Sequence, residues 1–185
     1  MSHAKAFRVI KPEIRVLGVD DGKFCPKTAG QTLVVGVVYS GGLSIDGVMH
    51  TKIAIDGSDA TTKISRMILT SPHRRQLRLV MLSGITFAGF NLVDIKKLTA
   101  DVGLPVLALT REKPDLDAIY RALKHLPFCE ERWSIVQNVG EIHEITNHGT
   151  KLYLSLVGLS LEEAIQVLNI TSLGGVILSL CELPT

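Results

Sequence analysis

Three strand-like segments follow one another in the first third of the chain, with no helix-length segment between them. They cover residues 14–19, 33–39 and 48–55. The first is β-branched and apolar and stops at the turn signal Asp20-Asp21-Gly22. The second is apolar almost throughout, as expected of a strand buried on both faces. Because no helix fits between them, we expect these strands to pair as an antiparallel meander.

A helical period replaces the strand pattern after the third segment. Ser58-Asp59 can cap a helix, and Ile64, Met67 and Ile68 recur at the spacing of one helix face. Strand and helix then alternate: strands are predicted over 77–82 and 105–109, and helices from Asn91 to Gly103 and from Pro114 to about His125. The predicted order is therefore β-β-β-α-β-α-β-α.

This order is typical of the ribonuclease-H-like fold. It is an α/β architecture with a mixed sheet, in which a three-strand antiparallel meander continues into parallel strands through right-handed crossovers, with flanking helices. A doubly wound Rossmann sheet is the main alternative, but it would need a helix between the first two strands. Residues 21–32 do not form one.

The rest of the chain gives weaker signals. A helix over 130–137, a strand over 151–157 and a helix over 161–168 are predicted. With 185 residues the chain has the length of one domain. We expect a single ribonuclease-H-like domain over 1–185, with irregular segments at 1–10 and 172–185.

Composition limits the setting and the partners. Apolar residues make up 46% of the chain and charged residues 21%, which predicts a well-filled core and a surplus that a homodimer would explain. The net charge of +2 neither demands nor excludes a nucleic-acid partner. Cys25, Cys129 and Cys181 are odd in number and far apart, which argues against disulfides and zinc and suits a reducing cytosol. Without a signal peptide or membrane-length apolar run, a cytoplasmic location is expected.

Four aspartates are the candidates for metal chemistry. They are Asp20 at the end of the first strand, Asp56 and Asp59 between the third strand and the first helix, and Asp94 in the second helix. Carboxylates gathered at one end of a sheet can bind Mg²⁺, which prefers hard oxygen ligands and stabilises a phosphoryl transition state. The alternative is that each aspartate forms a turn or caps a helix. Asp21 is interpreted as a turn residue or as a group that supports the metal ligands without binding the ion.

A glycine-containing loop joins the predicted fourth strand to the second helix. Its candidate substrate-binding residues are Gly84, Thr86, Phe87, Gly89, Phe90 and Asn91. Two glycines before a helix N-terminus can form an anion or substrate site. A tightly packed loop, with both phenylalanines in the core, is the alternative.

Basic residues cluster as His73-Arg74-Arg75 with Arg78, and as Lys96-Lys97. Such clusters can contact a phosphate backbone. For the first cluster, a solvated loop between helix and strand is the favoured interpretation.

Four strings together resemble one archaeal family. They are Gly18-Val19-Asp20-Asp21-Gly22, Asp56-Gly57-Ser58-Asp59-Ala60-Thr61, Gly84-Ile85-Thr86-Phe87-Ala88-Gly89-Phe90-Asn91 with Asp94, and Arg111-Glu112-Lys113-Pro114-Asp115-Leu116. The chain resembles, over about residues 10–170, the family once called domain of unknown function 99 and now endonuclease dU, a relative of endonuclease V. The resemblance implies a ribonuclease-H-like fold and Mg²⁺- or Mn²⁺-dependent cleavage of deoxyuridine-containing DNA, as in DNA repair.

The resemblance also assigns residues. Asp20 matches the metal-binding aspartate of the first strand, and Asp59, or less well Asp56, matches the second acid. Ser83, followed by Gly84, stands where endonuclease V has its third acid, so Asp94 would have to substitute. The family also carries a basic, histidine-containing segment near its C-terminus, which residues 174–185 lack.

Three functions follow as hypotheses. In the first, the chain is a DNA endonuclease with Asp20 and Asp59 as ligands and the 84–91 loop around a flipped base. In the second, it is a catalytically silent nucleic-acid-binding or scaffolding protein, which Ser83 favours. In the third, it is a small-molecule phosphotransfer or hydrolysis enzyme that uses the same acidic residues at the end of the first strand.

Overall fold

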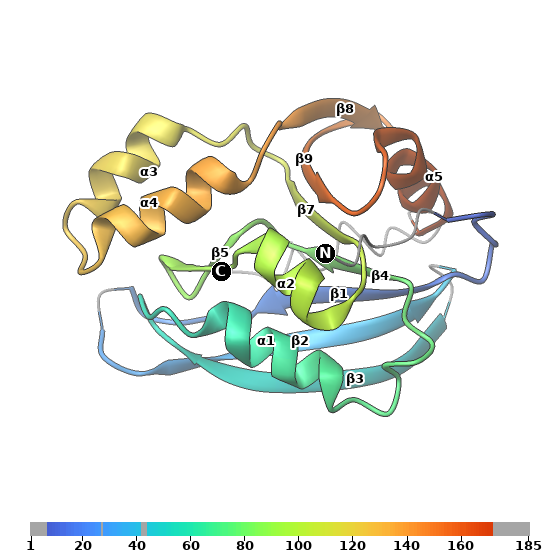
Figure 1. The fold of residues 1–185 in the computed structure, drawn as a ribbon, viewed down its shortest axis with the longest axis horizontal. Helices are drawn as coiled ribbons and strands as arrows, with labels where there is room; N and C mark the ends of the chain where they lie inside the picture. Colours follow the sequence, from blue (N-terminus) through green and yellow to red (C-terminus); the bar gives the residue numbers. More distant parts are fainter. Residues whose placement is uncertain (1–6, 27, 42–43, 172–185) are drawn as a thin grey trace.

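A seven-stranded mixed sheet forms the centre of the computed structural model, which describes residues 7–26, 28–41 and 44–171 (Figure 1). Its strands are β1 (Arg15–Asp21), β2 (Gln31–Ser40), β3 (Ser44–Ala54), β4 (Leu79–Leu82), β7 (Val106–Thr110), β8 (His143–Asn147) and β9 (Thr150–Val157). Their order across the sheet is β3-β2-β1-β4-β7-β9-β8.

The strand directions confirm the predicted ribonuclease-H-like plan. β1, β2 and β3 pair antiparallel, as the missing helix between them requires. β4 then pairs parallel with β1, and β7 parallel with β4. β9 returns antiparallel beside β7, and β8 forms the far edge.

The three parallel strands divide their side chains between two cores, because successive residues of a strand point to opposite faces. On one face lie Leu17, Val19, Val80, Leu82, Val106 and Ala108. On the other lie Val16, Leu79, Met81, Leu107 and Leu109. This explains why the sequences of these strands are apolar throughout rather than alternating.

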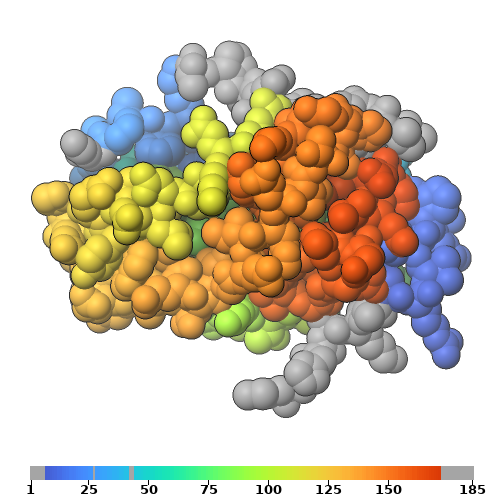
Figure 2. Space-filling model, turned by 90° about the horizontal axis from the view of Figure 1, so that it is seen from above, coloured from blue at the N-terminus to red at the C-terminus, as the bar shows by residue number. Residues whose placement is uncertain are grey.

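Helices cover both faces and one end of the sheet. α1 (Ala60–Leu69) and α2 (Ile95–Val102) lie side by side over the first core, whereas α5 (Leu161–Thr171) packs on the second (Figure 1). α3 (Leu116–Leu123) and α4 (Cys129–Asn138) form a pair beyond β7, and together with β8, β9 and α5 they cover the face seen in Figure 2. No helix in the described ranges has both the length and the apolar character to cross a membrane.

Two parts of the prediction need correction. The helix expected from Asn91 begins at Ile95, because Asn91 belongs to a small hairpin of β5 (Thr86–Phe87) and β6 (Asn91–Leu92). β8 was not predicted, since its sequence HEITN is mostly polar and lies at a half-exposed sheet edge. Residues 7–14 contain no helix or strand, so β1 begins at Arg15, one residue later than predicted. The expectations for 1–6 and for the tail from 172 onward lie outside the described residues.

Candidate active site

Asp20 and Ser83 meet at the carboxyl ends of β1 and β4, which are neighbouring parallel strands. Asp20 is the penultimate residue of β1, and Ser83 directly follows β4. The Ser83 hydroxyl donates a hydrogen bond to Oδ1 of Asp20, and the Ser83 N–H donates to the carbonyl of Val19 at 3.2 Å. Ser83, which the resemblance to endonuclease V predicts at the place of a third acid, therefore contacts Asp20 directly.

Burial shifts the pKa values of Asp20 and Asp21, which together form the acidic corner. It raises the pKa of Asp20 to about 6, while the hydroxyl of Ser83 and the N–H of Asp21 act in the opposite direction. The neighbouring charge of Asp21 raises the pKa of Asp20 further. Burial also raises the pKa of Asp21, whose Oδ2 accepts a 2.6 Å hydrogen bond from the N–H of Ala88. Two adjacent carboxylates are thus held in a partly desolvated place, where a bound cation would offset the cost of their charge.

Asp56 supports the tip of the β5–β6 hairpin. Its Oδ1 accepts a hydrogen bond from the N–H of Phe90 at 2.9 Å, and its own N–H donates to the carbonyl of Ala88 at 2.9 Å. Gly89 lies between Ala88 and Phe90 with φ +85°, and a Cβ at this position would stand 2.3 Å from Oδ1 of Asp56. The second glycine of the loop is therefore required by close packing against this carboxylate.

Asp59 lies at the N-terminus of α1, as predicted, but its side chain does not cap the helix. Its Oδ1 accepts hydrogen bonds from the N–H of Ala54 at 3.1 Å and from Nδ2 of Asn91 at 2.7 Å. Oδ1 of the fully buried Asn91 instead accepts a 2.9 Å hydrogen bond from the N–H of Ala60, the first residue of α1. Asn91 therefore provides a hydrogen-bond acceptor for a free N–H group at the start of α1, although it lies on β6. This favours a structural role for Asn91 over contact with a substrate.

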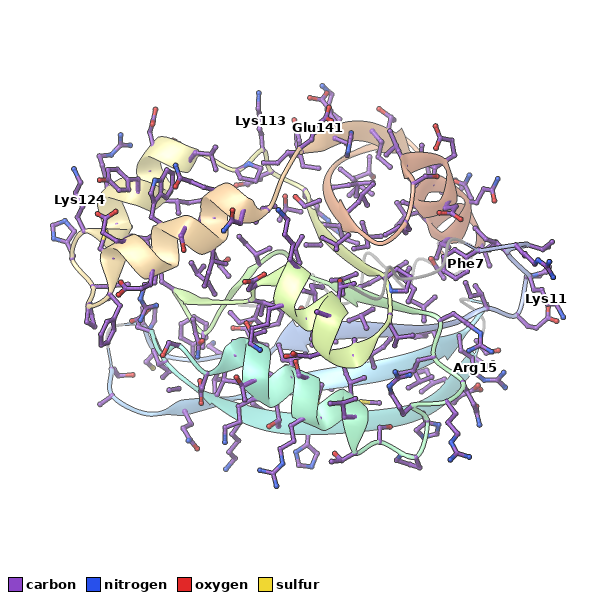
Figure 3. All side chains as sticks on the ribbon, viewed as in Figure 1. Phe7, Lys11, Arg15, Lys113, Lys124 and Glu141 are labelled. Carbon is purple, nitrogen blue, oxygen red and sulfur yellow. The ribbon has the colours of Figure 1, made fainter. Side chains whose placement is uncertain are left out.

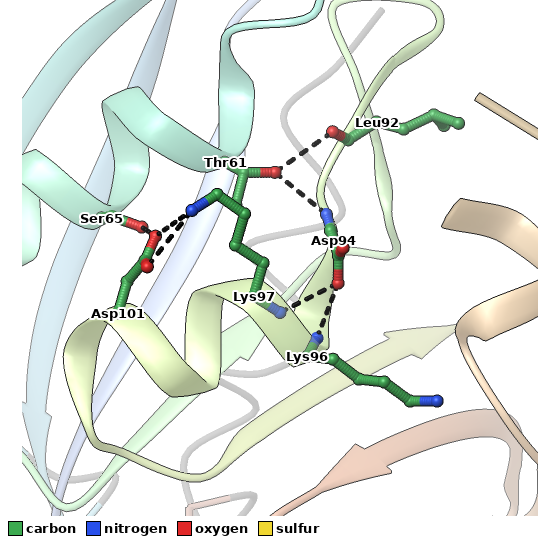
Figure 4. A network of polar contacts seen from close by, with 7 residues as sticks. All are labelled: Thr61, Ser65, Leu92, Asp94, Lys96, Lys97 and Asp101. Carbon is green, nitrogen blue, oxygen red and sulfur yellow. Dashed lines mark hydrogen bonds and ion pairs between the residues drawn. The ribbon is translucent and has the colours of Figure 1, made fainter. Parts of the chain in front are cut away.

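Asp94 caps α2. Its Oδ1 accepts hydrogen bonds from the N–H groups of Lys96 and Lys97, and its N–H donates to the hydroxyl of Thr61 on α1 (Figure 4). Because a carboxylate already binds these N–H groups, the start of α2 does not offer the anion site expected from the loop. The use of Asp94 as a substitute third acid stays a prediction.

Arg132 is a buried cation that the sequence did not reveal. It lies on α4 with 4% of its surface exposed, and its guanidinium donates to the carbonyls of Phe90, Asp56 and Pro127. Burial lowers its pKa, and the charge of Asp56 opposes this shift. The side chain ties α4 to the hairpin and to the β3–α1 loop. Nothing in the polar run CEERWSIVQN distinguishes this arginine from a solvated one.

The acidic corner offers two neighbouring carboxylates rather than a complete cluster. Among the residues that the structure describes, no three His, Cys, Asp or Glu side chains gather where they could hold a metal ion. Mg²⁺ often binds through only one or two carboxylates and keeps several waters. The donor chemistry of Asp20 with Asp21 therefore fits one such cation. The assignment of Asp56 and Asp59 as further ligands stays a prediction.

A mostly apolar cavity of about 130 Å³ borders this corner. It lies between Gly84, which directly follows Ser83, the end of β7 and the middle of β9, with α3 and α4 on its other side. Its walls include Ile85, Ala108, Thr110, Ile119, Val136, Gln137, Tyr153 and Ser155.

The predicted substrate-binding residues contribute unequally to this cavity. Gly84 lines it, whereas Phe87 is fully buried in the main core. Thr86 is exposed, and Phe90 packs partly buried in the cluster under α3 and α4. Only the start of the loop therefore borders the cavity that could receive a ligand.

Comparison with protein families gives a match to the model described as endonuclease dU, over residues 12–177. The chain is 42% identical over 167 residues to a UPF0215 protein of Methanothermobacter thermautotrophicus, covering 90% of this chain and 81% of the relative. It is 44% identical over 167 residues to a UPF0215 protein of Methanopyrus kandleri, covering 89% and 84%.

Solved structures give the same picture of the fold. A protein of unknown function from Archaeoglobus fulgidus matches with a TM-score of 0.76 and 38% identity, over 86% of both chains. Endonuclease V of Bacillus subtilis matches with a TM-score of 0.52 and 12% identity, over 86% of this chain and 73% of that one. Endonuclease V of Ciona intestinalis, crystallised with an inosine-containing DNA, matches with a TM-score of 0.52 and 11% identity, over 84% and 76%.

Proposed function

This chain belongs to the endonuclease dU family, and from that membership we propose that it is a divalent-metal-dependent endonuclease that cuts deoxyuridine-containing DNA. The observation that carries the proposal is the position of Asp20 at the carboxyl end of β1, beside Asp21 and with its pKa raised to about 6. The likeness of the fold to endonuclease V, one of which was crystallised with DNA, supports DNA as the substrate class.

Asp20 and Asp21 would hold the Mg²⁺ or Mn²⁺ ion. When bound, such a cation lowers the pKa of a coordinated water and neutralises charge on a phosphate. Asp20 has to be ionised to bind a cation, and above about pH 6 it is. The N–H of Ala88 orients the Asp21 carboxylate, and the Ser83 hydroxyl orients that of Asp20.

The damaged base would enter the cavity beside Gly84. A base must leave the helical stack before an enzyme can recognise it, and the receiving pocket must adjoin the reacting groups. Gly84 connects the cavity with the acidic corner, because it lines the cavity and directly follows Ser83, which contacts Asp20. The apolar wall and the ring of Tyr153 suit a flat pyrimidine, and Thr110 and Ser155 supply polar groups.

One assay tests the proposal. A labelled duplex with a single deoxyuridine is incubated with the protein in Mg²⁺, Mn²⁺ or EDTA. We expect nicking in Mg²⁺ or Mn²⁺ that EDTA abolishes and that Asp20→Asn reduces by about a hundredfold or more. Nicking that persists in EDTA or in Asp20→Asn would contradict the proposal.

Ser83 favours a second candidate function, a catalytically silent DNA-binding protein of the same fold. A serine cannot supply the negative charge of a third acid, and here it satisfies Asp20 with a neutral hydroxyl. Binding of the same duplex with no nicking, unchanged by EDTA, would identify this function. For either function we propose a cytoplasmic location, where Cys25 and Cys129, both free, would stay reduced.

A further inference from the structure

A basic groove lies at the opposite end of the sheet from Asp20. It has a volume of about 530 Å³ and lies between the N-terminal segment, the start of β1 and the loop between α1 and β4. β1 runs from Arg15 at the groove to Asp20 at the acidic corner, so the two places are separated by about 17 Å at roughly 3.3 Å per residue. The groove is therefore a separate surface from the candidate active site.

Cations dominate the lining of this groove. Arg8, Lys11, Arg15, Arg75 and Arg78 face it, against the single carboxylate of Glu13. Figure 3 shows Lys11 and Arg15 at one end of the molecule, far from Lys124 at the other. In a chain with a net charge of only +2, this gathering leaves like charges close together. An anionic ligand would relieve their repulsion.

Most of these cations form no ion pair with a residue that the structure describes. Of the five, Arg15 alone forms an ion pair among the described residues, at 2.6 Å with Asp46. Arg8, Lys11 and Arg75 are exposed, and Arg78 reaches only backbone carbonyls, those of Arg75 and Leu77. Four of the five side chains are arginines, whose planar fork binds phosphate oxygens in pairs.

The fold separates the basic cluster that stands out in the sequence. Arg74 turns inward and donates to the carbonyl of Val102, and the His73 ring packs against Gly47 on β3. Arg75 and Arg78 instead join cations that lie sixty or more residues earlier in the chain. The N-terminal segment is fixed in position by a 2.8 Å hydrogen bond from the N–H of Phe7 to Glu163 on α5. A solvated loop, the favoured interpretation of the sequence, does not explain this convergence.

We propose that the groove binds the phosphate backbone of nucleic acid, as a second contact surface at the end of the sheet remote from Asp20. Its volume of about 530 Å³ and its five cations suit several phosphates rather than one small anion. The exposed Val9 and the half-buried Phe7 give it an apolar wall for sugars between the charged groups. The inference rests on the proposal that the chain acts on DNA, but it holds whether or not the chain cuts DNA.

Salt-dependent binding tests the groove without any cleavage. The triple variant Arg8→Gln/Lys11→Gln/Arg75→Gln removes three exposed cations whose side chains form no hydrogen bond or ion pair with the residues that the structure describes. The matched control is Lys52→Gln/Lys63→Gln/Arg66→Gln, with the same charge change on β3 and α1. Affinity for a labelled, undamaged duplex of about 20 base pairs is measured by fluorescence anisotropy in EDTA, between about 50 and 200 mM salt.

The groove variant should lower the affinity by about tenfold or more at low salt. It should also reduce the steepness of the plot of log affinity against log salt concentration by about 2 to 3. Each lost phosphate contact reduces the magnitude of this slope by about 0.9. The control should change the slope by less than about 1. Equal changes in the two triples, or an unchanged slope in the groove variant, would overturn the inference. Failure of the wild type to nick DNA would instead refute the proposed nuclease and leave this result standing.

Discussion

The hydroxyl of Ser83 donates a hydrogen bond to Oδ1 of Asp20 and so joins the carboxyl ends of β1 and β4. A carboxylate at position 83 would repel Asp20 and raise its pKa further, whereas the hydroxyl stabilises the ionised form. Ser83 is therefore a neutral partner that keeps a half-buried acid available for a cation.

Ser83→Ala should raise the pKa of Asp20 above about 6, because burial would then act without the opposing hydrogen bond. The pKa can be followed through the ¹³C chemical shift of the Asp20 carboxyl group in an NMR titration. Ser134→Ala is the control, since the Ser134 hydroxyl is exposed and donates only to the carbonyl of Glu131. An Asp20 pKa that stays at its wild-type value in Ser83→Ala would show that the hydroxyl has no such effect.

Asp20→Asn should stabilise the protein at neutral pH when no divalent cation is present. The folded pKa of about 6 lies above the ordinary 3.8, so the unfolded chain loses this proton first as pH rises. The ionisation of Asp20 therefore lowers the stability of the wild type between about pH 4 and pH 6, and the variant lacks this contribution, whereas Asp21, whose pKa is also raised, titrates in both proteins. Urea unfolding should show no advantage for the variant below about pH 4 and a constant advantage above about pH 6. An equal difference at all pH values would contradict the raised pKa.

The order of elements was predictable because the strands and helices of the first 125 residues carry their own signals. The apolar runs of β1 and β2 and the helical spacing of Ile64, Met67 and Ile68 depend on local sequence and on burial in one core. The β5–β6 hairpin escaped prediction because a tertiary contact forms it. Asn91 is drawn into the hairpin by its bonds to Ala54, Asp59 and Ala60, so α2 starts four residues later.

Arg132→Ala should lower the free energy of unfolding by about 3 kcal/mol, because it leaves buried carbonyls without the donors they have in the native protein. Arg66→Ala is the control, because Arg66 is exposed on the last turn of α1, and it should change stability by less than about 0.5 kcal/mol. Chemical unfolding of both variants measures the difference. Similar losses in the two would show that the buried guanidinium does not hold α4 to the hairpin.

The candidate site was less predictable than the fold. Asp20 stands out because it follows an apolar strand-like run, and the structure places it near the end of β1. Its role as a metal ligand stays a prediction. The partners of Asp56, Asp59 and Asp94 are backbone groups and an amide from distant segments, and residue type alone does not distinguish such contacts from metal ligation. The cavity beside Gly84 forms only where α3 and α4 lie beside β7 and β9, and the contacts of Arg132 form only where α4 packs on the β5–β6 hairpin.

Gly89→Ala should destabilise the hairpin more than its backbone conformation explains. An alanine at φ +85° costs about 1–2 kcal/mol of strain, and its Cβ would also displace the Asp56 carboxylate that binds the N–H of Phe90. Gly149→Ala isolates the strain, because Gly149 has φ +81° and nothing within 4 Å of its Cβ position. Thermal unfolding should show a larger drop in Tm for Gly89→Ala. Equal drops would mean that the Asp56 carboxylate moves aside at no cost.

Gln137→Trp should block the cavity beside Gly84 while leaving the acidic corner intact. Gln137 is exposed on α4 and lines the cavity, so an indole there would fill space proposed for the flipped base. Nicking of a deoxyuridine duplex should fall by about tenfold or more in kcat/KM, with affinity for undamaged duplex unchanged because phosphate contacts dominate it. Gln166→Trp, an exposed glutamine on α5 outside the cavity, should keep full activity. If both variants cut at the wild-type rate, the base does not enter this cavity.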